Sequence, residues 1–330
     1  MEMKEITILG AGYSGLNLIK KIRGKNTEMK ITLIDKRQFY FDNVTYLESL
    51  SHKETIGLND FAKEYNIEFI NCQVEKINPK RKKIYLKEGE PLSFQMLVLA
   101  SGLKSKKISV NGEHREGFFY FSDIDPYKVR DLLKFNNDTA VYVSSMLGLK
   151  LAVTLRILKK EVRIVAPALD FLGEDANRVA TALNERGIQL YLNASIEEAI
   201  GEGCVKALKI VPLKIFPAEA IFIDSGWMPN IDFFDEAITG VGRCFTKESD
   251  IFILGDGNKP NLDGEFFYTD DYKEIDAQTD NLIGVLFSNK TPIIPEKTPN
   301  DTGLISDNQE NRKKVVEILL KRLESIPNPA

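Results

Sequence analysis

Three glycines and one aspartate near the N-terminus have the types and spacing of a turn that binds a dinucleotide. Gly10, Gly12 and Gly15 form the pattern G-x-G-x-x-G after a short apolar run, and a helix-like segment follows them. Asp35 lies 20 residues beyond Gly15, at the end of the next apolar run. In such a turn the first glycine permits a tight bend, the second lets the backbone approach a pyrophosphate, and the third lets the helix pack closely, while the acid accepts hydrogen bonds from ribose hydroxyls. The combination predicts a bound dinucleotide rather than a glycine-rich turn without a ligand.

A second turn of the same kind lies near the middle of the chain but lacks most of its glycines. In the stretch TAVYVSSMLGLKLA, residues 139–152, the three glycine positions read Val143, Ser145 and Gly148. Val143 resists the backbone geometry that glycine provides, and Ser145 places a Cβ atom where a pyrophosphate needs bare backbone. The strand expected next offers no carboxylate until Asp170. The sequence therefore predicts a second domain that keeps its fold but has lost ordinary NAD(P)H binding.

The elements that must position these turns follow from the apolar pattern. Residues 67–102 alternate short β-rich runs with turn residues, which predicts hairpins. They end in the unbroken apolar run Met96–Ala100, which predicts a buried strand. Because a strand, a turn and a helix occur in that order twice, we expect an α/β protein with two Rossmann-like domains.

These motifs and their order resemble the flavoproteins that contain two dinucleotide-binding domains, with most likeness to type II NADH dehydrogenases and sulfide:quinone oxidoreductases. GAGYSG and IDKR match the first fingerprint, LVLASG stands where the family has an Ala-Thr-Gly turn, and IDSGWMPN stands where its chain returns to the first domain. The sequence SDIFILGDG, residues 249–257, matches the second flavin fingerprint. The resemblance covers about residues 1–290 and implies FAD as the cofactor.

The motifs and the resemblance together assign residues to the FAD site. In the family, the aspartate here numbered Asp256 bonds the flavin ribityl chain. The helix of YKEIDAQTDNLIGVLF would point its N-terminus at the isoalloxazine, with Ala277 and Gln278 resembling the family's Ala-Gln step. The residues expected to bind FAD are Gly10, Gly12, Gly15, Asp35, Lys36, Arg37, Val74, Ala100, Ser101, Gly102, Gly255, Asp256 and Gln278. No catalytic residue and no metal site is assigned, and two histidines leave little room for a His-based site.

The resemblance also implies a domain organisation. Residues 1–104 and 229–290 would form a discontinuous FAD-binding domain, and residues 105–228 a degenerate NAD(P)-binding-like domain. Residues 291–330 would form a C-terminal arm and a helix, because three prolines between residues 292 and 299 favour an extended conformation.

The helix expected at residues 311–325 is basic and amphipathic. Its apolar stripe consists of Val316, Leu319, Leu320 and Leu323. Because the stripe lacks Trp and Phe, packing on its own domain is the favoured interpretation. The alternative is a helix that docks to a partner or attaches the protein peripherally to a membrane.

Departures from the family's sequence pattern limit the reactions that we expect of this chain. Cys72, Cys204 and Cys244 do not match the cysteine placement of sulfide:quinone oxidoreductases and form no CxxC pair, which argues against sulfide chemistry. Lys150 replaces the acidic residue that the family carries two positions after the third glycine. The segment after the second strand lacks the proline that type II NADH dehydrogenases have near the flavin. It contains aromatic residues that either line the flavin or pack in the core, with neither interpretation favoured. These aromatic residues are Phe39, Tyr40, Phe41 and Tyr46.

Composition limits the class of protein. The chain has 330 residues, of which 43% are hydrophobic and 28% charged, as in ordinary globular enzymes. A formal net charge of -4, without a basic patch, gives no electrostatic case for nucleic acid. No signal sequence and no run of eighteen apolar residues is visible, so we expect a cytoplasmic protein that does not span a membrane.

The function expected from these features is electron transfer by FAD to or from a protein partner. A similar group is the flavoprotein subunit of respiratory complex I variants that lack the usual NADH-oxidising module, and a lost NAD(P)H site fits such a role. The alternative is an NAD(P)H or sulfide:quinone oxidoreductase whose relaxed second turn still binds NADH weakly, with Lys150 or Arg163 contacting a phosphate. A third interpretation is a structural or regulatory flavin-binding protein without turnover.

Overall fold

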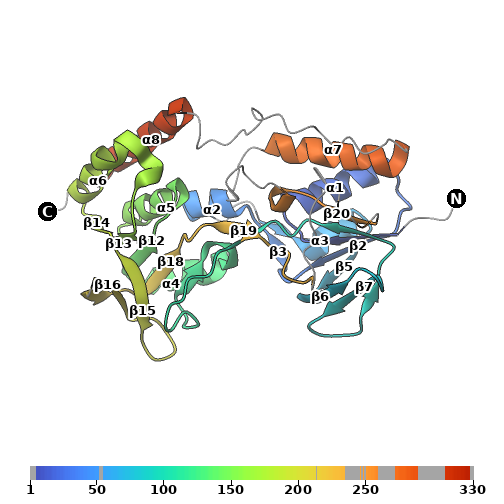
Figure 1. Ribbon diagram of the computed structural model, residues 1–330, viewed down its shortest axis with the longest axis horizontal. Coiled ribbons are helices and arrows are strands. Elements are labelled where there is room, and N and C mark those ends of the chain that lie inside the picture. The colour runs from blue at the N-terminus through green and yellow to red at the C-terminus, as the bar shows by residue number, and fades with distance from the viewer. Residues whose placement is uncertain are drawn as a thin grey trace. The chain divides into compact units, whose positions relative to one another are not determined.

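The chain folds into two compact units, which are drawn in Figure 1. The computed structural model describes residues 5–51, 55–212, 214–234, 246, 248, 250–258, 272–288 and 309–327. The first unit comprises the described residues within 1–42, 53–103 and 227–302, and the second those within 43–52, 104–226 and 303–330. Residues 43–52 therefore group with the second unit, although the sequence alone assigns them to the first domain.

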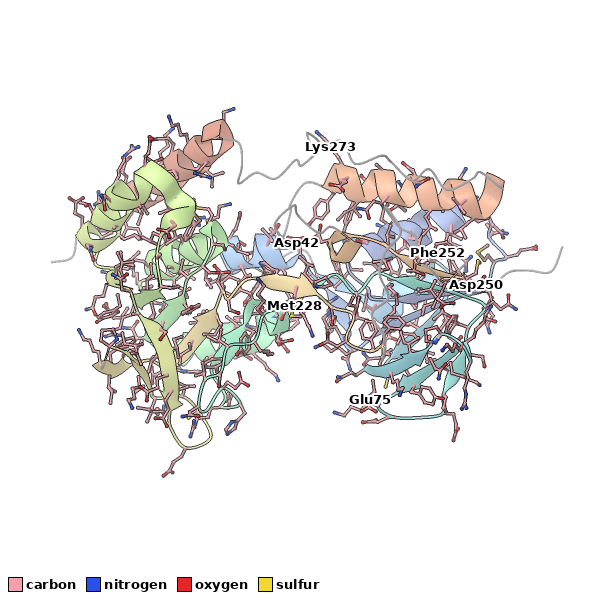
Figure 2. All side chains as sticks on the ribbon, viewed as in Figure 1. Asp42, Glu75, Met228, Asp250, Phe252 and Lys273 are labelled. Atoms are coloured by element: carbon pink, nitrogen blue, oxygen red, sulfur yellow. The ribbon has the colours of Figure 1, made fainter. Side chains whose placement is uncertain are left out.

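The first unit is built on a five-stranded parallel sheet of order β20–β9–β1–β2–β5. The strands are β1 (Ile6–Leu9), β2 (Ile31–Asp35), β5 (Glu68–Asn71), β9 (Met96–Leu99) and β20 (Ile251–Ile253). Every residue of β1, β2, β9 and β20 is buried, as expected of a parallel sheet covered on both faces. Figure 2 labels Asp250, which precedes β20 and pairs with Lys82 at an Nζ–Oδ2 distance of 2.6 Å.

Helices and a small antiparallel sheet complete the first unit. Its helices are α1 (Tyr13–Arg23), α3 (Leu58–Glu64) and α7 (Tyr272–Ser288), and its hairpin strands are β6 (Val74–Asn78), β7 (Lys83–Leu86) and β8 (Leu92–Ser93). Helix α1 buries Leu16, Ile19 and Ile22, whose helical spacing gives one apolar face, in the same core cluster as Ile8 and Val98 of the sheet. The predicted hairpins are present as antiparallel pairs β6–β7 and β7–β8.

The second unit contains another five-stranded parallel sheet, of order β11–β18–β12–β13–β14. The strands are β11 (Phe118–Tyr120), β12 (Asp138–Tyr142), β13 (Glu161–Ala166), β14 (Gln189–Leu192) and β18 (Ala220–Ile223). An antiparallel sheet is formed by β15 (Ser195–Ile200), β16 (Ala207–Val211) and β17 (Lys214–Pro217). The helices are α2 (Asn43–Ser49), α4 (Pro126–Phe135), α5 (Met146–Ile157), α6 (Ala176–Glu185) and α8 (Gln309–Glu324).

The remaining short elements are spread over both units. They are β3 (Phe39–Tyr40), β4 (Ile56–Gly57), β10 (Leu103–Ser105), β19 (Trp227–Pro229) and the 3-10 turns Phe121–Asp123, Asp170–Asp175 and Asp256–Asn258.

The two parallel sheets repeat one arrangement. Strand β9 lies beside β1 in the first unit as β18 lies beside β12 in the second. The N–H of Ala100 donates to the carbonyl oxygen of Leu9 at 2.8 Å, and the N–H of Asp224 donates to that of Tyr142 at 3.0 Å. Because Leu9 and Tyr142 are the last residues of β1 and β12, Ala100 and Asp224 occupy equivalent positions in the two units.

The C-terminal helix α8 packs within its own unit. The predicted stripe is buried: Val316, Leu319, Leu320 and Leu323 are all below a tenth exposed. Helix α8 contacts α5 and α6, and Arg178 of α6 pairs with Glu317 at an Nη1–Oε1 distance of 2.7 Å. The interpretation of this stripe as part of the protein's own core is confirmed. In the part of the chain that the structure describes, no helix is both long and apolar enough to cross a bilayer.

Replacing a buried leucine of α8 tests this packing. Leu319→Ala is expected to lower the free energy of unfolding by about 2–5 kcal/mol, because a cavity replaces a side chain that is 1% exposed. The matched control is Ile318→Ala on the same helix, since Ile318 is 56% exposed and its loss should cost under about 0.5 kcal/mol. Urea denaturation measures both values, and equal small effects would contradict the docking of α8 on its own unit.

Candidate functional site

The carboxyl ends of four neighbouring strands meet at one edge of the first sheet. In order these strands are β20, β9, β1 and β2. They lead into residues 254–257, 100–102, 10–15 and 35–37. In open parallel sheets, ligands bind outside the carboxyl ends of the strands. All residues assigned to FAD from the sequence lie in these four segments, apart from Val74 and Gln278.

The glycines of the first turn play three different steric roles. Gly10 has a φ of +108°, and a Cβ atom there would lie 2.3 Å from the carbonyl oxygen of Ala100. A Cβ atom on Gly15 would lie 2.1 Å from the carbonyl oxygen of Gly10. Gly12 has no atom within 4 Å of its would-be Cβ, and as the N-cap of α1 it makes no side-chain capping bond. The start of α1 therefore presents bare backbone to any anion that approaches Gly12.

Asp35 organises the loop beside this turn. Its side chain is 7% exposed. Oδ2 accepts from the N–H of Ala11 at 2.7 Å, and Oδ1 accepts from the N–H of Arg37 at 2.8 Å. The Arg37 guanidinium also donates to both oxygens at 3.2 Å. Burial alone would raise the pKa of Asp35, but the charge and hydrogen bonds of Arg37 and the N–H of Ala11 outweigh it and hold this pKa below its usual value.

Asn71 fixes the backbone on which Asp35 stands, and the sequence pattern did not identify it. Its Nδ2 donates to the carbonyl oxygens of Asp35 and Arg37, both at 3.0 Å. Val74 begins β6 three residues later and packs against the core cluster that contains Leu9 and Ile34. The side chain of Lys36 is exposed. The FAD-binding roles of Val74 and Lys36 stay predictions.

The loop after β20 is brought against the first turn by close backbone approaches. Gly255 has a φ of +90°, and a Cβ atom there would lie 2.4 Å from Oγ of Ser14. A Cβ atom on Gly257 would lie 2.9 Å from the carbonyl oxygen of Gly102. Asp256, between these two glycines, is buried and begins a 3-10 turn. The two flavin fingerprints, more than 230 residues apart in the chain, therefore lie side by side.

Gln278 acts on this loop through the backbone. Its side chain is buried, and Oε1 accepts from the N–H of Gly255 at 2.9 Å. The Pro-Asn step noted in the sequence holds the loop after β9 in a similar way: Oγ of Ser101 donates to the carbonyl oxygen of Asn230 at 2.7 Å, and the N–H of Asn230 donates to that of Gly102 at 3.0 Å. These contacts give Gln278 and Ser101 a positioning role around the strand ends.

Helices α1 and α7 run in the same direction, so their N-termini lie at the same edge. Tyr13 stacks on Tyr272 with ring centroids 4.0 Å apart, and its hydroxyl donates to Oδ1 of Asp276 at 2.9 Å. Further along both helices, Nζ of Lys21 lies 2.7 Å from Oδ1 of Asp280. Two helix N-termini facing one ligand edge suit the phosphates and the ring system of a dinucleotide cofactor. The residues present in the first unit therefore fit FAD.

The aromatic residues after β2 differ in burial, and a role of any of them in lining the flavin stays a prediction. Phe41 and Tyr46 are buried, and the hydroxyl of Tyr46 donates to the carbonyl oxygen of Pro126 within the second unit. Phe39 is 41% exposed. Burial, and then the nearby Asp42 carboxylate, raise the pKa of Tyr40 to about 12, so its hydroxyl stays protonated at neutral pH.

The described residues include two of the three cysteines. Cys72 and Cys204 are both free, and Cys244 lies outside the described residues. Within those residues, no group of three or more His, Cys, Asp or Glu side chains is placed to hold a metal ion.

The second turn differs from the first in backbone and in partners. The N–H of Val143 donates to the carbonyl oxygen of Val165 at 2.9 Å, as that of Gly10 does to Ile34, so Val143 occupies the first glycine position. Unlike Gly10, Val143 does not have a positive φ. Ser145 is the N-cap of α5, and its Oγ accepts from the N–H of Leu147 at 3.2 Å.

Asp224 lies against this second turn, and its role was not foreseen from the sequence. Its Oδ2 accepts from the N–H of Ser145 at 2.8 Å, from Oγ of Ser145 at 2.7 Å and from the N–H of Ser144 at 3.2 Å. Burial raises the pKa of Asp224 above its usual value, and the hydrogen bonds from Ser145 and Ser144 oppose that rise. The N–H groups of Ser144 and Ser145, just before α5, are therefore already engaged.

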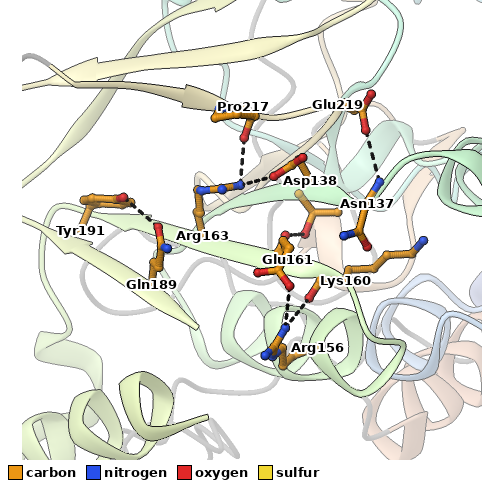
Figure 3. A network of polar contacts seen from close by, with 11 residues as sticks. Asn137, Asp138, Arg156, Lys160, Glu161, Arg163, Gln189, Tyr191, Pro217 and Glu219 are labelled. Carbon is orange, nitrogen blue, oxygen red and sulfur yellow. Dashed lines mark hydrogen bonds and ion pairs between the residues drawn. The ribbon is translucent and has the colours of Figure 1, made fainter. Parts of the chain in front are cut away.

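The two basic residues that could have met a phosphate have carboxylate partners of their own. Nζ of Lys150 lies 2.6 Å from Oε1 of Glu48 in α2. Figure 3 shows Arg163 between Asp138 and Pro217, with its Nη1 2.7 Å from Oδ1 of Asp138 and 3.0 Å from the carbonyl oxygen of Pro217. These contacts weaken the interpretation in which either residue receives the phosphate of NADH.

Gly12 provides a direct test of the cofactor cradle. Gly12→Ala should leave the fold intact, because the new Cβ meets no protein atom, but it should weaken FAD binding by about tenfold or more, because it fills the approach to the pyrophosphate. The matched control is Gly24→Ala at the other end of α1, where the nearest atom is an ordinary 3.6 Å away. Flavin retention and thermal melting are measured for both. Unchanged FAD affinity in Gly12→Ala would contradict the assignment.

Asp35 should make a contribution to stability that depends on pH. Because its pKa is lowered from 3.8 in the folded chain, the stabilisation is present above about pH 4 and is lost as the pH falls through the folded value. Asp35→Asn should cost about 1–3 kcal/mol of unfolding free energy at pH 7, and this difference from the wild type should shrink toward pH 3. Urea denaturation across this range measures it. Asp60→Asn, at an 87% exposed side chain on α3, is the control, and a pH-independent gap for Asp35→Asn would count against the linkage.

Comparison with known proteins agrees with this geometry. The model of the pyridine nucleotide-disulphide oxidoreductase family matches residues 4–263. The ferredoxin–NAD(+) reductase component of the p-cumate 2,3-dioxygenase system of Pseudomonas putida is 24% identical, covering 80% of this chain and 70% of that protein. The type II NADH:quinone oxidoreductase of Staphylococcus haemolyticus is 26% identical, covering 77% of this chain and 74% of that protein. The NAD-dependent persulfide reductase from A. fulgidus shares the fold, with a TM-score of 0.71 at 21% identity.

The matches cover most of this chain but not always most of the related protein. The persulfide reductase comparison covers 88% of this chain but 60% of that one, so this chain spans only part of that relative. The α/β fold with Rossmann-like domains and FAD as the cofactor, both predicted from the sequence, are confirmed. The family match covers well over half of the residues, and the chain therefore belongs to the pyridine nucleotide-disulphide oxidoreductase family.

Proposed function

We propose that this protein is an FAD-binding electron-transfer flavoprotein whose second unit has impaired NAD(P)H binding. The observation that carries the proposal is the contrast between its two turns. Gly12 leaves the start of α1 open to a phosphate, whereas Asp224 takes up the backbone donors of Ser144 and Ser145. Electrons would then enter and leave through partners other than a nicotinamide bound in the usual place.

In this proposal residues 1–104 and 229–290 form the FAD-binding domain, whose core is the first unit, and residues 105–228 form the degenerate domain. FAD, when bound, supplies one- or two-electron transfer. The chain's part would be to bind and orient it: the bare backbone at Gly12 would hold the pyrophosphate, Asp35 the adenosine end, and Asp256 the ribityl chain. No general acid or base is assigned, because transfer through a flavin depends on orientation.

The partner is proposed to be a redox protein. A relative from Pseudomonas putida is named as the ferredoxin–NAD(+) reductase component of a dioxygenase system, which supports a protein at one end of the electron path. A finer version places this chain in a respiratory redox complex, as a flavoprotein subunit that replaces an NADH-oxidising module. Its support is the resemblance to such subunits together with the altered second turn.

The second candidate is an NAD(P)H or sulfide:quinone oxidoreductase with an unusual donor site. It is favoured by the similarity to the type II NADH:quinone oxidoreductase of Staphylococcus haemolyticus. The cysteines weigh against the sulfide branch, since Cys72 and Cys204 are free and stand in different units. The NADH branch requires that a dinucleotide displace the side-chain contacts of the second turn.

Anaerobic reduction of the flavin separates the two candidates. NADH at millimolar concentration should leave the oxidised flavin absorbance unchanged over minutes, because Asp224 already holds the N–H groups of Ser144 and Ser145. Dithionite and a reduced ferredoxin should each bleach it. Rapid bleaching by NADH would overturn the proposed loss of NAD(P)H binding and favour the oxidoreductase. Bleaching by dithionite alone would remove the support for a ferredoxin-like donor.

A further inference from the structure

Asp224 stands at the position that Ala100 occupies in the first unit. Ala100 and Asp224 each follow the strand next to the turn, and each donates its N–H to the last residue of the turn-forming strand. The chain therefore contains its own comparison. The same place in the same fold is occupied by an alanine beside a turn that is open at Gly12, and by an aspartate that accepts from Ser144 and Ser145 of the other turn.

The carboxylate takes the donors that a dinucleotide would need. A phosphate binds at the start of a helix through the backbone N–H groups of the turn. In the second unit, the N–H groups of Ser144 and Ser145 both point at Oδ2 of Asp224, at 3.2 and 2.8 Å. An incoming pyrophosphate would have to displace this oxygen, and it would bring negative charge against a buried acidic group.

The surroundings of Asp224 are fitted to its side chain. Asp224 is 1% exposed, and among the described residues none donates to its other oxygen, Oδ1. A Cβ atom on Gly148 would lie 2.6 Å from Oδ2, so the one glycine that the second turn keeps makes room for the carboxyl group. Ser145, which replaces the second glycine, adds a hydroxyl donor to the same oxygen at 2.7 Å. The changes in the turn and the acid beside it thus form one arrangement.

We propose that Asp224 is a specificity-determining residue: its carboxyl group occupies the pyrophosphate position of the second turn and thereby excludes dinucleotides from this unit. The inference deepens the proposed function and rests on it. It differs from the simpler idea that the missing glycines alone abolish binding. In that case Val143 and Ser145 would suffice, and the identity of residue 224 would not matter.

Converting Asp224 to the residue of the first unit tests the proposal. The holoprotein with FAD bound is titrated with ADP-ribose, and separately with inorganic pyrophosphate, by isothermal calorimetry at constant ionic strength. Asp224→Ala should bind ADP-ribose about tenfold or more tightly than the wild type, an effect on the scale of one charge-assisted hydrogen bond. Because Val143 and Ser145 stay in place, affinity equal to that of the wild type would overturn the proposal.

A matched control and a second variant keep the result interpretable. Asp138→Ala removes a carboxylate from the opposite end of the same sheet, where Asp138 pairs with Arg163, and it should not change the affinity. An equal gain in Asp138→Ala would show a general charge effect and would also overturn the proposal. If Asp224→Ala fails to fold by circular dichroism, Asp224→Ser is used, since its hydroxyl can still accept from one turn donor while leaving room for an anion.

The outcome is separable from that of the proposed function. The proposed function fails if NADH bleaches the wild-type flavin, which is an electron-transfer measurement. The inference fails if residue 224 does not change the affinity for ADP-ribose, which carries no electrons to the flavin. A wild type that NADH does not reduce, combined with equal affinities of the wild type and Asp224→Ala for ADP-ribose, would leave the proposed function standing and remove Asp224 as its cause.

Discussion

The start of a helix beside the ends of parallel strands carries backbone N–H groups that need a partner, and this need organises both units of the protein. Orphan donors at such a place are costly to bury and are satisfied by caps, water or ligands. The first turn leaves the space over Gly12 open for a ligand. The second turn satisfies its donors internally with Asp224 and Ser145. One supersecondary unit thus reaches two different states through the side chains around it.

Keeping the first turn open depends on the close contacts and hydrogen bonds around it. The close approach of Gly10 to Ala100, and of Gly15 to Gly10, leaves no space for side chains, so the turn is fixed by backbone contact. The buried carboxylate of Asp35 is tolerable because Arg37 and backbone donors surround it, as a buried charge requires. Stability and the shape of the binding edge therefore depend on the same few contacts.

Much of the fold could be predicted from the sequence because the signals are local. The apolar runs at β1, β2 and β9, the glycine pattern and the stripe of α8 each lie within a short window. The contacts missed are long-range. Asp224 meets Ser145 across 79 residues, and Tyr13 meets Asp276 across 263, and no spacing rule in a single sequence connects such positions. The grouping of α2 with the second unit also depends on long-range contacts and was not predicted.

The difference between the turns also changes what each unit needs in order to be stable. A ligand that binds only the folded state adds stability in proportion to the logarithm of its concentration over its Kd. The first unit, with an open turn, gains from FAD in this way. The second unit carries its acceptor in the chain, since Asp224 accepts from the N–H groups of Ser144 and Ser145 without any nucleotide. If NAD(P)H binding is lost as proposed, the side chain of Asp224 supplies the acceptor that the buried donors of this turn would otherwise lack.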